Sequence, residues 1–270
     1  MKGTGWNAQG IQAAALVCLA VIAMNAAPAG AEEMQGMSMA PEAAAGTQAE
    51  PETAGAGPMK MGGGMEVAHP FFTHMGVPED VGTYSLRLSS LARKVEGDWK
   101  ADAAFHFEAG LTDTMGFHLR NNAFFAEPRT EATLQFAALR SNDRMSGISP
   151  FIEAEFPTQS VHGEAVDAFI GVSTALENST AAWNQSIEYD PKNETVEGSA
   201  AFVWKVGERF FPVVEVIAEA AKGERPIINQ LEGLKYRIND SLLLGVAVET
   251  PVTHNKDFTA QFVVQLEMNL

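Results

Sequence analysis

FTAQFVVQLEMNL, residues Phe258–Leu270, is the stretch that decides the fold class of this 270-residue chain. Successive side chains of a strand point to opposite faces, whereas a helix would scatter them around its axis. The pattern therefore predicts a strand of about 13 residues, long enough to cross a bilayer when tilted. One predicted face is wholly apolar and consists of Phe258, Ala260, Phe262, Val264, Leu266, Met268 and Leu270.

The same period-2 alternation recurs upstream and predicts about twelve strands in a meander. Short turns at Thr112-Asp113 and Asn239-Asp240 join neighbouring strands into hairpins. Pro212 is expected at a strand's first turn or at a bulge, with Arg209–Phe211 still in the turn. The predicted strands are Tyr84–Leu88, Phe105–Leu111, Phe117–Leu119, Ala132–Ala138, Ile152–Phe156, Val166–Val172, Trp183–Tyr189, Phe202–Val206, Val214–Ala220, Leu234–Ile238, Leu242–Val248 and the final stretch.

The second face of nearly every predicted strand is charged or amide-bearing, which a sandwich would expose to water and a membrane barrel would turn into its lumen. Strand length favours the barrel. We therefore predict an all-β, antiparallel up-and-down transmembrane β-barrel of about twelve strands over residues 67–270, preceded by a disordered arm. The predicted lumen-lining residues are Arg87, His106, Glu108, His118, Arg120, Lys235 and Arg237.

One group within that set, His106, Glu108, His118 and Arg120, lies on neighbouring predicted strands with the side chains on one face. Such a group could bind a metal ion or an anionic solute. Ordinary lumen lining, in which acids and bases neutralise one another, is the favoured interpretation.

The amino terminus carries the features of an export signal. Lys2 precedes an apolar stretch over Ile11–Met24, and Ala29-Gly30-Ala31 offers the small-x-small pattern of a cleavage site. We predict a cleaved signal peptide over residues 1–31, and an uncleaved membrane anchor is the alternative. Cys18, the only cysteine, lies within it, so the mature chain would have no thiol for disulfides, zinc or catalysis.

Charge and motifs exclude several classes of function. Removing Lys2 with the signal peptide leaves 17 basic residues against 34 acidic ones, a net charge of −17. A nucleic-acid partner is not expected, because phosphate binding needs a positive surface. No catalytic or dinucleotide-binding motif is present, so we assign no catalytic and no cofactor-binding residue and predict that the chain is not an enzyme. A barrel lipid hydrolase would need a Ser/His pair that the sequence does not offer.

Residues 32–66 are rich in Ala, Gly, Pro and Glu and contain no aromatic residue, so we expect a disordered linker. Their methionines resemble the Met-rich motifs of periplasmic copper-resistance proteins, and thioethers prefer Cu(I) or Ag(I). The alternatives are a tail whose methionines bind nothing, or a lid near the barrel mouth. The candidate metal ligands are Met34, Met37, Met39, Met59, Met61, Met65, His69, His74 and Met75.

The run Leu231–Asp240, followed by Leu242–Val248 and Pro251-Val252, resembles bacterial outer-membrane proteins of the MetA-pathway-of-phenol-degradation or "transporter" family. The resemblance implies an outer-membrane barrel that passes small molecules, and it implies no catalytic site. The final strand also resembles the signal read by the barrel-assembly machinery, with Leu270 where an aromatic residue is usual.

These features together predict a bacterial outer-membrane protein, in contact with lipid, that transports small solutes and is linked through its arm to copper or heavy-metal handling. The alternative is a soluble periplasmic β-protein that binds Cu(I) or Ag(I) through its Met-rich arm.

Overall fold

The computed structural model describes residues 67–121, 123–124, 129–141, 145–157, 166–253 and 258–270. The predicted signal peptide and Met-rich linker, residues 1–66, lie outside the described residues. Within the described part of the chain, no helix is long and apolar enough to cross a membrane.

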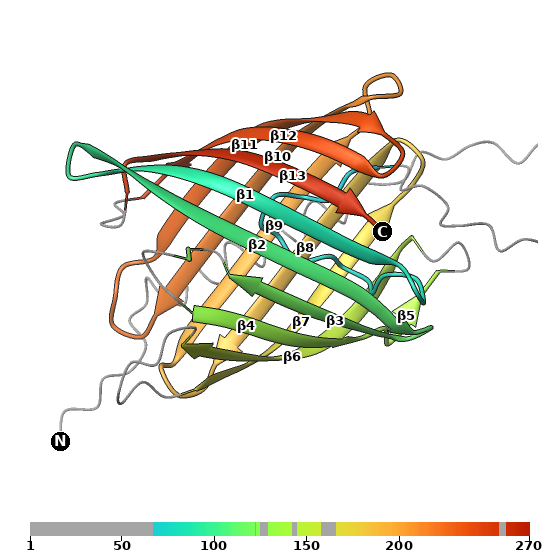
Figure 1. Ribbon diagram of the computed structural model, residues 1–270. Helices are drawn as coiled ribbons and strands as arrows, with labels where there is room; N and C mark the ends of the chain where they lie inside the picture. Colours follow the sequence, from blue (N-terminus) through green and yellow to red (C-terminus); the bar gives the residue numbers. More distant parts are fainter. Residues whose placement is uncertain (1–66, 122, 125–128, 142–144, 158–165, 254–257) are drawn as a thin grey trace, which may run out of the picture.

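The described residues form one antiparallel sheet that closes on itself (Figure 1). β1 pairs with β13, and β4 pairs with β6, so the twelve long strands make a complete ring. β5 is a two-residue strand that pairs only with β6. The predicted fold class and number of barrel strands are confirmed. The strands are β1 (Tyr84–Val95), β2 (Asp98–Thr112), β3 (Met115–Asn121), β4 (Arg129–Phe136), β5 (Leu139–Arg140), β6 (Gly147–Pro157), β7 (Asp167–Glu177), β8 (Ala181–Asp190), β9 (Thr195–Trp204), β10 (Phe210–Ala221), β11 (Ile227–Asn239), β12 (Leu242–Pro251) and β13 (Ala260–Asn269).

Apolar and polar side chains separate across the wall because consecutive residues of each strand face opposite sides. On β13, Phe262 and Val264 are exposed on the outside, whereas Gln265 and Glu267 are buried inside. The outer face is apolar around the ring, whereas the inner face also carries buried apolar side chains, among them Leu91, Val203, Phe211, Leu231 and Val263. Exposed apolar side chains on the outer surface include Leu88, Ile152, Ile170, Phe202, Val216, Leu244 and Val246.

Two local expectations are wrong. β13 begins at Ala260, and Phe258 is buried rather than part of the outer apolar face. Phe258 precedes the strand, so strand alternation does not apply to it. β10 begins at Phe210, so Phe210 and Phe211 belong to the strand and not to the turn. Pro212 is accommodated because the ladder with β9 begins only at Val213, which leaves one side of β10 open at that point.

The two ends of the barrel differ. Tyr84 and Leu270 lie together at one end, where the amide of each donates to the carbonyl of the other. Short turns such as Asp113–Thr114 and Asp240–Ser241 are at this end, which we call the turn end. The opposite end, the loop end, carries the connections between β3 and β4, β6 and β7, and β12 and β13, whereas the turn end also carries one long connection, residues 137–146, which includes β5. The turn end lies at the right of Figure 1 and the loop end at the left.

The exposed apolar belt should tolerate charge poorly in a bilayer. Val264 lies near the middle of β13 and is 49% exposed, whereas Val252 lies just beyond β12 and is 62% exposed. We expect Val264→Arg to lower the free energy of unfolding in lipid vesicles by about 2–4 kcal/mol, and Val252→Arg by no more than about 1 kcal/mol. Denaturant titration of the two variants measures this difference, and equal effects would contradict a lipid-facing belt.

Candidate functional site inside the barrel

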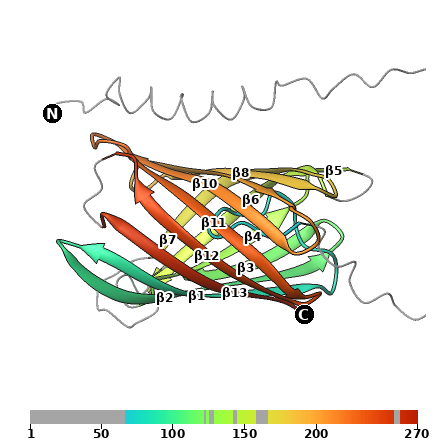
Figure 2. The ribbon, with the colours of Figure 1, turned by 90° about the horizontal axis from the view of Figure 1, so that it is seen from above.

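Residues 67–83, which we call the inner segment, run through the inside of the barrel before β1 begins (Figures 1 and 2). The segment forms no helix, and its only strand-like contact is a single bridge from Val81 to Gly110. All residues from 67 to 78 are buried except the half-buried Phe72. This part of the lumen is therefore filled by protein.

The base of the inner segment is clamped by His69. Its Nε2 lies 2.9 Å from Glu79 Oε1, and its Nδ1 lies 2.9 Å from Glu267 Oε1 on β13. Lys235 Nζ donates to the other oxygen of Glu267 at 2.7 Å. Because residues 69 and 79 meet, the chain between them is a loop that rises into the barrel and returns to the turn end.

The carboxylates around His69 favour the protonated, positively charged form of its imidazole ring. Burial by itself lowers the pKa of His69, but the carboxylates of Glu267 and Glu108 outweigh it and raise the pKa to about 10. A folded-state pKa above the ordinary value of 6.5 means that the ion pairs contribute full stability below about pH 6.5. That contribution is lost as the pH rises through about 10.

The top of the loop is held by Glu215 of β10. Its carboxylate accepts hydrogen bonds from the backbone N–H groups of Phe71, Phe72 and Thr73, the last at 2.9 Å, and from the Thr73 hydroxyl at 3.0 Å. Glu215 is fully buried, so these charge-assisted bonds are shielded from water. One wall carboxylate thus satisfies three consecutive backbone donors.

Other wall side chains satisfy the backbone oxygens of the inner segment. An irregular buried segment has no ladder partners of its own, so each of its polar groups needs a partner elsewhere. One backbone donor of the segment, the N–H group of Gly76, donates to Asn184 Oδ1 at 3.1 Å. The carbonyl acceptors are Pro70, bonded by Arg87 (2.9 Å) and Lys235 (3.2 Å); Phe71, bonded by Gln265 (3.3 Å); Met75, bonded by Gln135 (2.8 Å); and Pro78, bonded by Arg140 (2.9 Å).

Glycines in the wall make room for the segment. The Phe71 ring lies where side chains at Gly233 and Gly245 would be, and added Cβ atoms would lie 2.6 and 2.8 Å from its ring carbons. Asp80 approaches Gly110 in the same way, because an added Cβ would lie 2.0 Å from its carbonyl oxygen. Gly233 and Gly245 are among the residues on which the family resemblance rests. A glycine within a strand often marks close approach by another part of the chain, so these two glycines indicate that a segment contacts the inner wall there.

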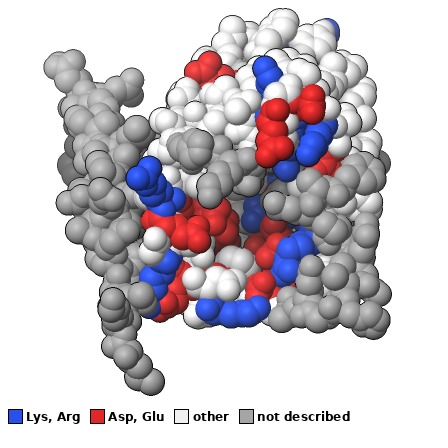
Figure 3. Space-filling view, turned by 90° about the vertical axis from the view of Figure 1, so that its left-hand side faces the viewer, with Lys and Arg blue, Asp and Glu red and all other residues white. Residues whose placement is uncertain are grey.

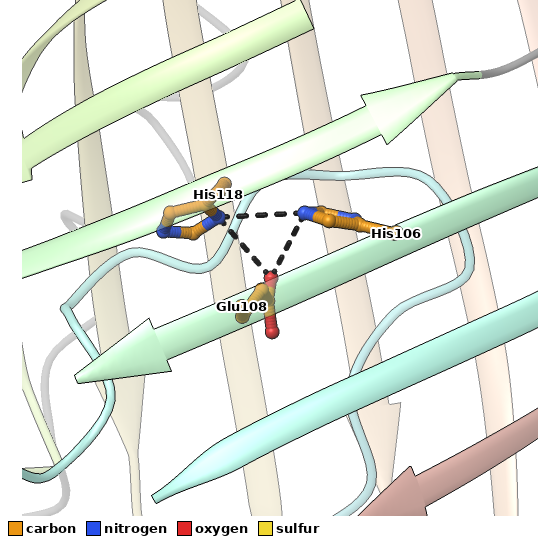
Figure 4. A group of neighbouring side chains, drawn as sticks. All are labelled: His106, Glu108 and His118. Atoms are coloured by element: carbon orange, nitrogen blue, oxygen red, sulfur yellow. Dashed lines mark hydrogen bonds and ion pairs between the residues drawn. The ribbon is translucent and has the colours of Figure 1, made fainter. Parts of the chain in front are cut away.

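His106, Glu108 and His118 point toward one another from β2 and β3 (Figure 4). Glu108 Oε1 lies 3.2 Å from His106 Nε2 and 3.3 Å from His118 Nδ1. Arg87 bonds both Glu108 and His106 Nδ1, the latter at 2.7 Å. Arginine only donates, so His106 Nδ1 accepts and Nε2 carries the proton. Arg87 therefore already neutralises the carboxylate of this group.

A cavity of about 270 Å³ lies beyond the inner segment. Its lining side chains come from the loop-end halves of the strands, and Figure 3 looks into that end, where acidic and basic residues gather in a hollow. Phe72 and His74 of the inner segment contribute to its lining. Burial and the nearby Arg120 keep the pKa of His74 well below its usual range, so the ring is neutral. The charged lining residues are Glu131, Glu188, Glu197, Glu219, Glu249, Arg93 and Arg120.

The predicted site residues fall into two places. Arg87, His106, Glu108, His118, Arg120 and Lys235 are buried inside the barrel, and Arg237 is half-buried with its guanidinium over the Phe211 ring. Met34, Met37, Met39, Met59, Met61 and Met65 lie outside the described residues. His69, His74 and Met75 are in the inner segment and buried. Sequence reasoning missed Glu215, whose acidic side chain on an inward-facing position gave no sign of its partner.

No model of a known protein family matches the sequence, and no curated protein matches it either. Solved structures do resemble the barrel. A KdgM porin is 10% identical, with a TM-score of 0.51 over 68% of this chain and 98% of that chain. An outer membrane channel from Pseudomonas putida F1 is 7% identical, with a TM-score of 0.50 over 78% of this chain and 100% of that chain. The chain has the fold of porin-like outer-membrane channels.

The Glu215 contacts give a direct test of how the inner segment is held. Glu215→Gln keeps the size of the side chain but loses its charge, and bonds to a charged group contribute about 1.5–3 kcal/mol each. We expect the amide hydrogens of residues 71–73 to exchange at least about tenfold faster, measured by hydrogen exchange on the folded barrel. The control is Glu249→Gln, a carboxylate bonded to Gln261 instead. Unchanged exchange at residues 71–73 would show that Glu215 does not hold the segment.

Proposed function

We propose that the protein is a bacterial outer-membrane channel for small solutes, with a preference for cations, and that the inner segment closes it. The observation that carries the proposal is a closed barrel with an apolar exterior, whose polar lumen is filled at one end by an irregular segment and hollow at the other. The segment is held by side chains rather than by sheet pairing, so it can leave the lumen without breaking the barrel wall.

The orientation follows from the two ends. Outer-membrane barrels have short periplasmic turns and longer extracellular loops. The turn end, with Tyr84 and Leu270, would therefore face the periplasm, and the inner segment would enter from there. The cavity at the loop end would open to the outside. A solute coming from outside would meet the cavity first and the inner segment second.

The preference for cations follows from the charge of the cavity. Five glutamates and two arginines line it. Rings of carboxylates favour cation passage, because they attract cations and repel anions at close range. Arg93 bonds Gln261 and Arg120 bonds Glu131, so both positive charges are held against the wall. Carboxylates outnumber arginines on the cavity surface, so a solute in the cavity meets net negative charge.

Planar-bilayer recording tests the channel. We expect the detergent-extracted wild type to conduct rarely, because the inner segment blocks the lumen. Glu215→Gln combined with Phe71→Ala should raise the fraction of time open several-fold. Glu197→Gln with Glu249→Gln should instead shift the reversal potential in a KCl gradient toward less cation preference, with unchanged opening. A correctly folded double variant that conducts no more than the wild type would refute closure by the inner segment.

Several finer points from the sequence belong to this proposal. We infer export by a cleaved signal peptide over residues 1–31, insertion by the barrel-assembly machinery and membership of the phenol-degradation "transporter" group. The support is the N-terminal pattern, the final alternating strand and the Leu231–Val252 motif. We also infer that the protein is not an enzyme. Recovery of the mature chain in a soluble fraction without detergent would favour the soluble periplasmic alternative.

A link to copper or heavy-metal handling rests on the six methionines between Met34 and Met65. Their thioethers suit Cu(I) or Ag(I). His69 bonds Glu79 and Glu267 inside the barrel, so we propose that the methionines bind without it. Cu(I) titration of the mature protein should show binding that is lost when these six residues are replaced by leucine. Binding that survives the replacement would remove the link.

A further inference from the structure

Three side chains converge at the bottom of the acidic cavity, and they come from different parts of the chain. His74 belongs to the inner segment, Glu153 to β6 and Glu188 to β8. One ligand atom from each lies within 4.8 Å of the other two. Gly171 of β7 stands directly opposite Glu188 in the sheet. It carries no side chain, and the Phe151 ring of β6 packs over it and lies 5.2 Å from the His74 ring.

Two of these three groups are buried and have one polar atom without a hydrogen-bond partner. His74 is 3% exposed and Glu188 is 7% exposed. His74 Nε2 and Glu188 Oε2 have no hydrogen-bond partner among the described residues. A buried polar atom without a partner costs about 1–3 kcal/mol, and more for a charged group. Both residues line the cavity, so both unpartnered atoms belong to groups that border open space.

The carboxylates near this site outnumber the positively charged side chains. Arg120 is the nearest cation, but its Nε bonds Glu131. Its Nη2 lies 3.7 Å from Glu153 Oε1 and 3.8 Å from Glu188 Oε1, too far for hydrogen bonds. One guanidinium thus faces three carboxylates. The Glu108 group differs, because Arg87 bonds its carboxylate directly.

We propose that His74, Glu153 and Glu188 bind a divalent transition-metal ion such as Zn²⁺. An imidazole nitrogen with two carboxylate oxygens is a donor set that such ions accept, at metal–ligand distances of about 2.0–2.2 Å. The open cavity above leaves room for water to complete the coordination. Thr133 donates to Glu153 Oε2 at 2.6 Å and orients that carboxylate, as hydrogen bonds to metal ligands commonly do.

This site shares His74 with the candidate metal ligands predicted from the sequence but differs from the methionines in its chemistry. Nitrogen and oxygen donors suit divalent ions, whereas thioethers suit Cu(I) and Ag(I). It also joins a residue of the inner segment to two residues of the wall. A bound ion would therefore hold the inner segment in the lumen, a consequence that rests on the proposed function, whereas the binding site itself does not.

Zn²⁺ titration of the full mature protein in detergent tests the site. We expect Glu188→Gln and His74→Gln each to remove one bound equivalent or to weaken it at least tenfold. Glu249→Gln, a buried carboxylate on the same cavity, should change affinity less than twofold. Each variant differs from the wild type at one side chain, so the comparison isolates the contributions of His74 and Glu188. Heat-modifiable gel mobility confirms that each variant is folded. Equal Zn²⁺ binding by the wild type and both ligand variants would overturn the site.

Conductance measured with and without Zn²⁺ tests the coupling. We expect Zn²⁺ to reduce opening of the wild type and to leave the opening of Glu188→Gln unchanged. An equal response of the two proteins would overturn the coupling. A protein that binds the Zn²⁺ equivalent but never conducts would refute the proposed channel and leave the metal site standing, so the two failures are distinguishable.

Discussion

The interior of this barrel is organised by the need of an irregular buried segment for hydrogen-bond partners. Residues 67–78 have no regular secondary structure to satisfy their backbone, and water does not reach most of them. The wall supplies the partners instead: Glu215 accepts from three consecutive amides, and Arg87 and Lys235 converge on one carbonyl. Burying the charges of Glu215, Arg87 and Lys235 would be costly without partners, and the backbone of the inner segment supplies them. The cavity at the loop end lies beyond the inner segment, where the wall side chains no longer bond to its backbone.

The fold could be predicted because strand alternation is local. Each stretch such as Phe262–Leu270 shows by itself which side chains face lipid and which face inward. The same argument predicted that Arg87, His106, Glu108, His118, Arg120 and Lys235 share the inner face, and the structure places them there. Alternation does not apply outside the strands, as at Phe258, where no sheet dictates the direction of the side chain, and it is imperfect near the end of β10, where Ala220 is buried.

The partners of those inner residues could not be predicted, because they come from distant parts of the chain. Glu215 bonds residues more than a hundred positions away, and nothing in its own strand distinguishes it from Glu219. His69 and His74 were grouped with the methionines by closeness in sequence, yet His69 bonds Glu267 of the wall and Glu79 of its own segment, and His74 pairs with Glu153 of the wall. Gly233 and Gly245 carried information of another kind. A glycine in a strand often marks close approach by another part of the chain, but it does not say which part.

The seam between β1 and β13 has a consequence for how the molecule assembles. It joins residues from opposite ends of the barrel sequence, such as Ser85 and Asn269. Such long-range pairing forms slowly, because the chain loses conformational entropy on closing a long loop before any contact stabilises it. The inner segment immediately precedes β1 and also bonds β13, through His69 to Glu267 and through Phe71 to Gln265. We therefore expect it to act as a folding template that recruits the last strand to the first. A segment that closes the finished pore would thus also speed the closing of the ring.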